Sequence, residues 1–292
     1  MKFGVSLYSF HEYAADDRLG VKGCIDKAKE MGFEGVDLVE GPCKSFPDKD
    51  EYIAYARDIG AYCRKAGIEP VCFCIMSDFI NGCDGDTQAE IERVKDLVDV
   101  AAAYGVPIMR HDATYGVKDS PNKCAMTFDA MLPTLANAYR EVTAYAERKG
   151  IRTCVENHGF FMQDAARIEK LLTTVDHPNF GVLLDIGNFA DADCPIPYSV
   201  GTLAPYAIHA HAKDVHIKDG LCEDPGEGWF CTRGGNYLRG AIIGHGDMPV
   251  SGCIRALKGA GYDGYLVIEF EGLEDPLCGI RMSYDNLKRF CK

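Results

Sequence analysis

Residues 150–156, Gly-Ile-Arg-Thr-Cys-Val-Glu, end a long helical pattern (about 125–149) and begin a short apolar strand that finishes on a carboxylate. A glycine after the last turn is the usual left-handed end of a helix. Short apolar strands that alternate with amphipathic helices are typical of parallel βαβ units. This stretch therefore predicts an α/β fold.

The same unit recurs on both sides of this stretch, with helical patterns that end at Gly67 and Gly105. Eight such units favour a closed (β/α)₈ TIM barrel of about 250 residues plus loops, and we expect a single domain over 1–292. No Gly-x-Gly-x-x-Gly motif supports an open nucleotide-binding sheet. The predicted strands are 2–10, 36–40, 70–75, 107–111, 152–156, 181–185, 208–212 and 265–270, and the predicted helices are 20–31, 50–66, 86–104, 125–149, 165–174, 198–205, 250–260 and 277–290.

One connection is much longer than the others. Residues 213–249 follow the seventh strand, contain Trp229 and many glycines, and show no helical pattern. Loops of this length in a compact domain are usually functional. We expect a loop between the seventh strand and the helix that follows it, and we expect this loop to cover the mouth of the barrel, with a surface insertion as the alternative.

Composition narrows the function classes. The formal net charge of −13 argues against a protein that tracks nucleic-acid phosphates. The 14 cysteines include no Cys-x-x-Cys pair, so we interpret them as reduced thiols of a cytoplasmic protein. No secretory leader is evident at residues 1–7, and no apolar run is long enough to span a membrane.

The last four strands each end on a metal-ligating side chain: Glu156, Asp185, His211 and Glu269. The carboxyl ends of barrel strands form the active-site face, so these groups share one rim. Buried acids persist by pairing or by coordinating metal. Three carboxylates and an imidazole suit one divalent ion, Mn²⁺ foremost, with Mg²⁺, Co²⁺ or Zn²⁺ possible.

Two positions leave alternatives open. Glu271 shares a strand face with Glu269, and His209 shares one with His211. We favour Glu269 by its motif and His211 by its place nearer the rim, which leaves His209 as a hydrogen-bonded core residue. Other strand ends and loops supply substrate-binding candidates: Glu40, His111 with Arg110 beside it, His158, Lys213, Trp229, His245 and, near the first strand, Tyr8 and His11.

Five motifs stand at the strand ends and in one turn: Val155-Glu156-Asn157, Leu184-Asp185-Ile186-Gly187-Asn188, His209-Ala210-His211-Ala212-Lys213-Asp214, Gly244-His245-Gly246-Asp247 and Ile268-Glu269-Phe270-Glu271-Gly272. They resemble the sugar phosphate isomerase/epimerase group of xylose-isomerase-like TIM barrels, which includes ketose 3-epimerases, hydroxypyruvate isomerase, inosose dehydratase and, more distantly, endonuclease IV. The resemblance implies that Glu156, Asp185, His211 and Glu269 bind the metal and that the two glutamates also act as the acid/base pair.

The sequence departs from the ketose 3-epimerase pattern at two places. Asn188 stands three residues after the Asp ligand, where those enzymes often have a substrate-holding His, and we expect Asn188 to contact substrate in its place. The stretch Lys213-Asp214-Val215-His216 lacks the Arg that often follows the ligand His. The metal site is unaffected, but the particular reaction stays open.

The leading functional prediction is a metal-dependent isomerase or epimerase that moves a proton on a small carbohydrate through a metal-stabilised enediolate. The alternative is a lyase on the same scaffold, either an inosose-type dehydratase or a C-glycoside-cleaving subunit. Metal-dependent DNA repair conflicts with the acidic charge, and a non-catalytic barrel is the remaining reading. A homo-oligomer or a heteromeric subunit is possible.

Overall fold

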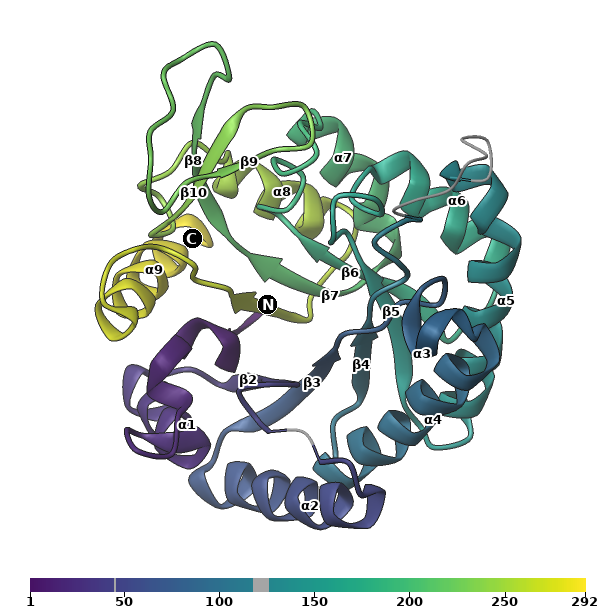
Figure 1. Cartoon of the computed structure of the whole chain (residues 1–292). Coiled ribbons are helices and arrows are strands. Elements are labelled where there is room, and N and C mark those ends of the chain that lie inside the picture. Colours follow the sequence, from purple (N-terminus) through teal and green to yellow (C-terminus); the bar gives the residue numbers. More distant parts are fainter. Residues whose placement is uncertain (45, 118–125) are drawn as a thin grey trace.

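A computed structural model describes residues 1–44, 46–117 and 126–292. Eight parallel strands close into a barrel in the order β1-β11-β7-β6-β5-β4-β3-β2, with helices around the outside (Figure 1). The barrel strands are β1 Lys2–Ser6, β2 Gly35–Val39, β3 Glu69–Ile75, β4 Ile108–His111, β5 Arg152–Glu156, β6 Phe180–Asp185, β7 Ala207–Ala212 and β11 Tyr265–Ile268. The TIM-barrel prediction is therefore confirmed.

The helices form where the sequence supplies their ends. Asp48 and Asp86 accept backbone N–H groups in the first turns of α2 and α4, and Gly67 and Gly105 end these helices at positive φ angles of 73° and 79°. The α-helices are α1 Gly20–Met31, α2 Lys49–Ala66, α3 Gly82–Gly85, α4 Thr87–Tyr104, α5 Phe128–Glu147, α6 Ala165–Val175, α7 Ile196–Leu203, α8 Val250–Gly259 and α9 Pro276–Phe290, and the 3₁₀ helices are η1 Leu7–Ala14 and η3 Ala204–Tyr206.

The first strand is shorter than predicted. β1 ends at Ser6, and residues 7–14 form η1 instead of continuing the strand to residue 10. The side chain of Ser6 accepts a hydrogen bond from the N–H of Tyr8, which starts the turn. Leu7 and Phe10 are fully buried, so packing of this segment against the barrel stabilises the helical turn.

The connection 213–249 forms a small antiparallel sheet in the order β8-β10-β9, beside the barrel (Figure 1). Its strands are β8 Asp214–Lys218, β9 Phe230–Cys231 and β10 Tyr237–Ala241. The carboxylate of Asp214 accepts the N–H groups of Gly244, Gly246 and Met248, which closes the connection onto its own start. Among the described residues, no helix has the length and apolarity that crossing a membrane requires.

Candidate metal centre and pocket

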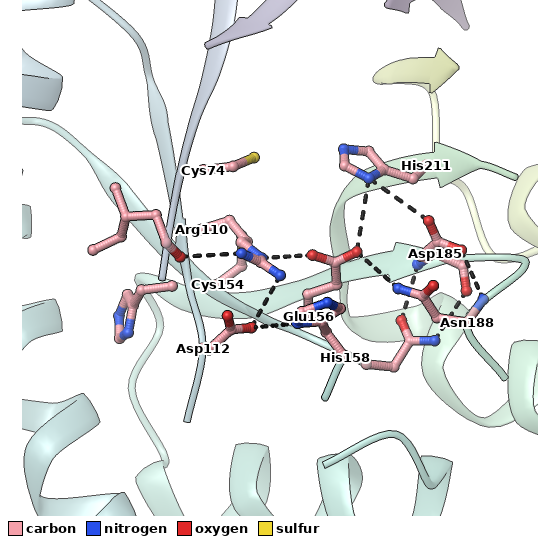
Figure 2. Close-up of polar contacts among 12 residues, drawn as sticks. Cys74, Arg110, Asp112, Cys154, Glu156, His158, Asp185, Asn188 and His211 are labelled. Carbon is pink, nitrogen blue, oxygen red and sulfur yellow. Dashed lines mark hydrogen bonds and ion pairs between the residues drawn. The ribbon is translucent and has the colours of Figure 1, made fainter. Parts of the chain in front are cut away.

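Strands β5, β6, β7 and β11 are neighbours in the barrel, and their carboxyl ends converge on one point. The rim cluster, Glu156, Asp185, His211 and Glu269, offers ligand atoms that all lie within 4.8 Å of one another. His211 Nδ1 lies 3.7 Å from a carboxylate oxygen of each of the three acids. Figure 2 shows His211 facing Glu156 and Asp185.

Asp185 is held by its own turn. Its Oδ1 accepts the backbone N–H groups of Gly187 at 2.6 Å and Asn188 at 2.8 Å, while the side chain of Asn157 bonds both backbone groups of Asp185. These contacts leave Oδ2 buried without a hydrogen-bond partner among the described residues. Because an unsatisfied buried oxygen is costly, Oδ2 of Asp185 is suited to coordinate a cation.

Asp37 orients the imidazole ring of His211. Its Nε2 lies 3.0 Å from Asp37 Oδ2, which holds a proton on Nε2 and turns Nδ1 toward the three acids. Although burial opposes it, the charge of Glu269 and the hydrogen bond to Asp37 raise the pKa of His211, so a cation at Nδ1 would displace a proton. Nδ1 is buried, faces the three acids and has no hydrogen-bond partner in the described part of the chain. A metal-ligating histidine with a carboxylate behind it has this arrangement.

The two glutamates each pair with a cation. Glu156 Oε2 lies 2.5 Å from Arg110 Nε, and Glu269 Oε2 lies 2.8 Å from Lys213 Nζ. Burial opposes ionisation of Glu269, but the charges of Lys213 and His211 hold its pKa well below the usual value. Each glutamate thus keeps one oxygen on a cation and the other toward the common centre.

The donor set fits a divalent cation. Ligand atoms around an ion with bonds of about 2.1 Å lie about 3.0–3.4 Å apart, close to the 3.7 Å seen here. Burial and the charges of Glu269 and Glu156 raise the pKa of Asp185 to about 7, against the opposing charge of Lys213. A cation would relieve this repulsion and satisfy both orphaned atoms.

A cavity of about 430 Å³ opens directly above the cluster. This volume lies in the range of small-molecule sites. Five of the predicted candidates line it: Tyr8, Glu40, Arg110, His158 and Lys213. His158 Nδ1 lies 3.2 Å from Asp112 Oδ1, and although burial opposes it, the charge of Asp112 raises the pKa of His158. Glu271 also lines this cavity.

His111 and Asn188 do not line this cavity, contrary to prediction. Successive residues of a strand face opposite sides, so Arg110 points into the barrel and His111 points outward, stacked on Tyr139 with ring centroids 4.5 Å apart. Asn188 lies beneath the cavity, where its side chain donates to Glu156 and accepts from Lys213. Asn188 therefore holds the side chains of Glu156 and Lys213 in place and does not face the cavity.

The long connection also lies away from the cavity. Trp229 is half-buried between Lys218 and Arg239, each 5.3 Å from its ring, and His245 is exposed in a turn. No residue of 214–249 lines the cavity, so the predicted cover over the mouth is wrong. The reason is that antiparallel pairing of β8 with β10 folds the segment on itself.

Sequence reasoning missed Asp37 and Asp112. Asp37 lies within β2 and contacts both His209 and His211, and Asp112 follows β4 and pairs with Arg110 at 2.9 Å. A single acid in an otherwise apolar strand was the available signal for Asp37. Its partners are about 170 residues away, so the sequence alone could not identify them.

Comparison with known proteins supports this architecture. The chain belongs to the xylose isomerase-like TIM barrel family, whose model matches residues 25–290. It is 24% identical over 247 residues to an inosose dehydratase of Histophilus somni, covering 79% of each chain.

Two solved structures share the fold. D-psicose 3-epimerase with D-tagatose from Clostridium cellulolyticum H10 has a TM-score of 0.73 at 18% identity and covers 100% of both chains. The IolI protein with a bound zinc atom has a TM-score of 0.73 at 15% identity and covers 100% of this chain and 98% of its own. The Histophilus somni relative is named as a dehydratase and the Clostridium cellulolyticum structure as an epimerase, and both are enzymes.

Proposed function

We propose that this protein is a divalent-metal-dependent isomerase or epimerase that transfers a proton on a small carbohydrate. One observation carries the proposal: Glu156 and Glu269 come from the two outer strands of the four that form the rim cluster, so they approach the common centre from opposite sides. Two carboxylates on opposite sides of a substrate can remove a proton and return one.

The rim cluster would hold the ion, and Mn²⁺ is our preferred choice because three of the four ligands are carboxylates. The bound ion would polarise a substrate carbonyl and so acidify the neighbouring C–H. Arg110 pairs with Glu156 and Lys213 pairs with Glu269. The charge of Lys213 keeps Glu269 ionised, ready to accept a proton. Lys213 Nζ and the half-buried His158 present donors to substrate oxygens in the cavity.

Relatives support a carbohydrate substrate. A ketose epimerase and an inosose dehydratase both act on polyhydroxylated carbonyl compounds, and both match most of this chain. The zinc atom in the IolI structure supports metal binding by this barrel type and keeps Zn²⁺ as the alternative ion.

The test is exchange of substrate C–H hydrogen with D₂O. Wild-type protein loaded with Mn²⁺ should introduce deuterium next to the carbonyl of at least one compound in a panel of free ketoses and inososes. Glu156→Gln and Glu269→Gln should each abolish this exchange. Glu274→Gln, an exposed position outside the cavity, is the matched control and should retain it. Full exchange in both rim variants would refute the assignment.

A dehydratase is the second candidate, favoured by the match to inosose dehydratase over 79% of the chain. It would begin with the same proton removal and then expel a hydroxyl group from the adjacent carbon as water. Mass spectrometry of the products separates the two candidates, because dehydration lowers the product mass by one water and epimerisation leaves it unchanged.

A further inference from the structure

A second cavity adjoins the cavity above the rim cluster. Each has a volume of about 430 Å³, and three residues line both of them: Tyr8, Gly41 and Pro42. The wall of the second cavity is completed by residues of η1, of the turn after η1 and of the segment after β2, namely His11, Ala14, Ala15, Asp16 and Lys44. The proposed function uses none of these five residues. Because the first cavity already has the volume of a small-molecule site, the second is available to a group joined to the reacting sugar.

The second cavity contains apolar groups, of which Tyr8 is the largest. Tyr8 is 40% exposed, although Leu7 and Ser9 on either side of it are fully buried. Three smaller apolar residues line the same cavity: Ala14, Ala15 and Pro42. A sugar ring presents C–H groups on its faces, and covering an exposed aromatic ring with them removes apolar surface from water. Tyr8 and its apolar neighbours therefore suit the face of a second sugar ring.

The polar groups of the second cavity suit an uncharged ligand with hydroxyl groups. Lys44 Nζ lies 2.6 Å from Asp16 Oδ2, so the two charges offset each other and favour neither an anion nor a cation. His11 Nε2 lies 3.1 Å from the carbonyl oxygen of Phe270, which can only accept a hydrogen bond. Nε2 therefore donates, and Nδ1 of the neutral ring remains an acceptor for a hydroxyl group.

The backbone of His11 is strained. Its φ of 48° and ψ of −126° lie in a region that residues with a side chain rarely adopt, and glycine would occupy this conformation more easily. Strained residues of this kind cluster at ligand-binding and active sites, where the surrounding structure holds them. A histidine at this position places an imidazole in the wall of the second cavity at a cost in backbone energy.

We propose that the second cavity binds a second sugar ring, so that the substrate is a two-ring carbohydrate in which a glycosidic bond joins the reacting ring to an uncharged partner ring. The reacting ring lies above the rim cluster, and the partner ring covers Tyr8. Hydroxyl groups of the partner ring bond to His11 and to the pair of Asp16 and Lys44. This assignment rests on the proposed function, which places the reacting ring in the first cavity.

Binding of fructose and of disaccharides that contain a free fructose unit tests this assignment. The probes are turanose, lactulose, leucrose and isomaltulose, which carry the second sugar on O3, O4, O5 and O6 of fructose. In isothermal titration of the Mn²⁺-loaded protein, we expect at least one of them to bind about tenfold more tightly than fructose, since one or two added hydrogen bonds supply that difference. Ala15→Trp fills the second cavity and should abolish the difference without changing the affinity for fructose.

His11→Gly is the second variant, because glycine keeps the positive φ while the imidazole is lost. Relief of the backbone strain offsets the lost hydrogen bond to Phe270, so the unfolding free energy should stay nearly unchanged. Disaccharide binding should nevertheless weaken and fructose binding should not, which a purely structural role of His11 would not produce. The matched control is Ala54→Trp, at an exposed position of α2 that lines neither cavity, and it should bind every sugar as the wild-type protein does.

The assignment is overturned if no disaccharide binds more tightly than fructose, or if the preference persists in both variants. Deuterium exchange on the same samples separates this result from the proposed function. A preference for a disaccharide without any exchange counts against the proton transfer and leaves the second cavity as a sugar site. Exchange with equal affinities for all the sugars counts against the second ring and leaves the proton transfer intact.

Discussion

His211 Nε2 lies 3.0 Å from Asp37 Oδ2, on the side of the imidazole ring opposite the rim carboxylates. This contact holds a proton on Nε2 and turns Nδ1 toward the rim carboxylates, where a cation would take the place of its proton. Carboxylates in this position typically change metal affinity or activity 10- to 100-fold when removed.

Asp37→Asn should therefore weaken binding of Mn²⁺ at the rim cluster by about 10- to 100-fold. An amide accepts the Nε2–H bond less strongly than a carboxylate and can present its own N–H instead. Isothermal titration with Mn²⁺ measures the change. Asp26→Asn, an exposed change on α1, is the control, and an affinity equal to that of the control would contradict this role.

Metal affinity should depend on pH through Asp185. In the metal-free protein burial raises the pKa of Asp185 to about 7, so below pH 7 the carboxyl group holds a proton that a cation must displace. The apparent Kd for Mn²⁺ should then fall at least about tenfold per pH unit as the pH rises toward 7, because His211, whose pKa is also raised, releases a proton as well. A weakly buffered titration detects this proton release. An affinity that is constant between pH 5.5 and 7.5 would show that Asp185 is not a ligand.

His111 should lower stability in acid. Burial lowers its pKa from 6.5 to about 3, so the unfolded chain binds this proton more readily than the folded one. The contribution of the neutral His111 ring to the free energy of unfolding is fully present above about pH 6.5 and is lost as the pH falls from 6.5 toward 3. At pH 5 the loss is about 2 kcal/mol. His111→Phe should reduce the difference in unfolding free energy between pH 8 and pH 5 by about that amount in urea titrations. An unchanged difference would contradict the burial of a neutral ring.

Much of the fold was predictable because each helix end and strand is encoded locally. Apolar runs such as 181–185 fix the strands, and glycines after the helices fix where they end. The rim cluster was predictable for a related reason, since strand ends in a barrel share one face. Glu156 could be placed in the rim cluster from the sequence because it is the last residue of the predicted strand 152–156.

The features of the site that the sequence did not predict depend on contacts between segments that are distant in the chain. Arg110 and His111 are adjacent polar residues at the end of β4, and only the register of β4 against β3 and β5 decides which one faces inward. Asp37 finds its partners across the barrel, and Trp229 lies where β8 and β10 pair. Such pairings are long-range and have no local sequence signal.

Lys213 should stabilise the metal-free protein. Its Nζ lies 2.8 Å from Glu269, 3.3 Å from Glu271 and 3.9 Å from Asp185, with only 7% of its side chain exposed. Removing one partner from a buried ion pair costs about 3–5 kcal/mol. Lys213→Met should lower the unfolding free energy by about that much without metal and by less when Mn²⁺ is bound.

The matched control is Lys288→Met, which removes a lysine paired with Asp285 on the exposed face of α9. Exposed pairs contribute about 0–1 kcal/mol, so this variant should barely change stability. Equal effects of the two lysine variants in chemical denaturation would argue against a buried charge network around Lys213.

The central claim is that the rim cluster holds one divalent ion, and Mn²⁺ binding by Asp185→Asn tests it most directly. Electron paramagnetic resonance of free Mn²⁺ in a titration counts the bound ions. The account predicts one Mn²⁺ per wild-type chain and a loss of affinity of at least about 100-fold in Asp185→Asn, since the amide removes a charged ligand. Equal Mn²⁺ binding by both proteins, or none by either, would contradict it.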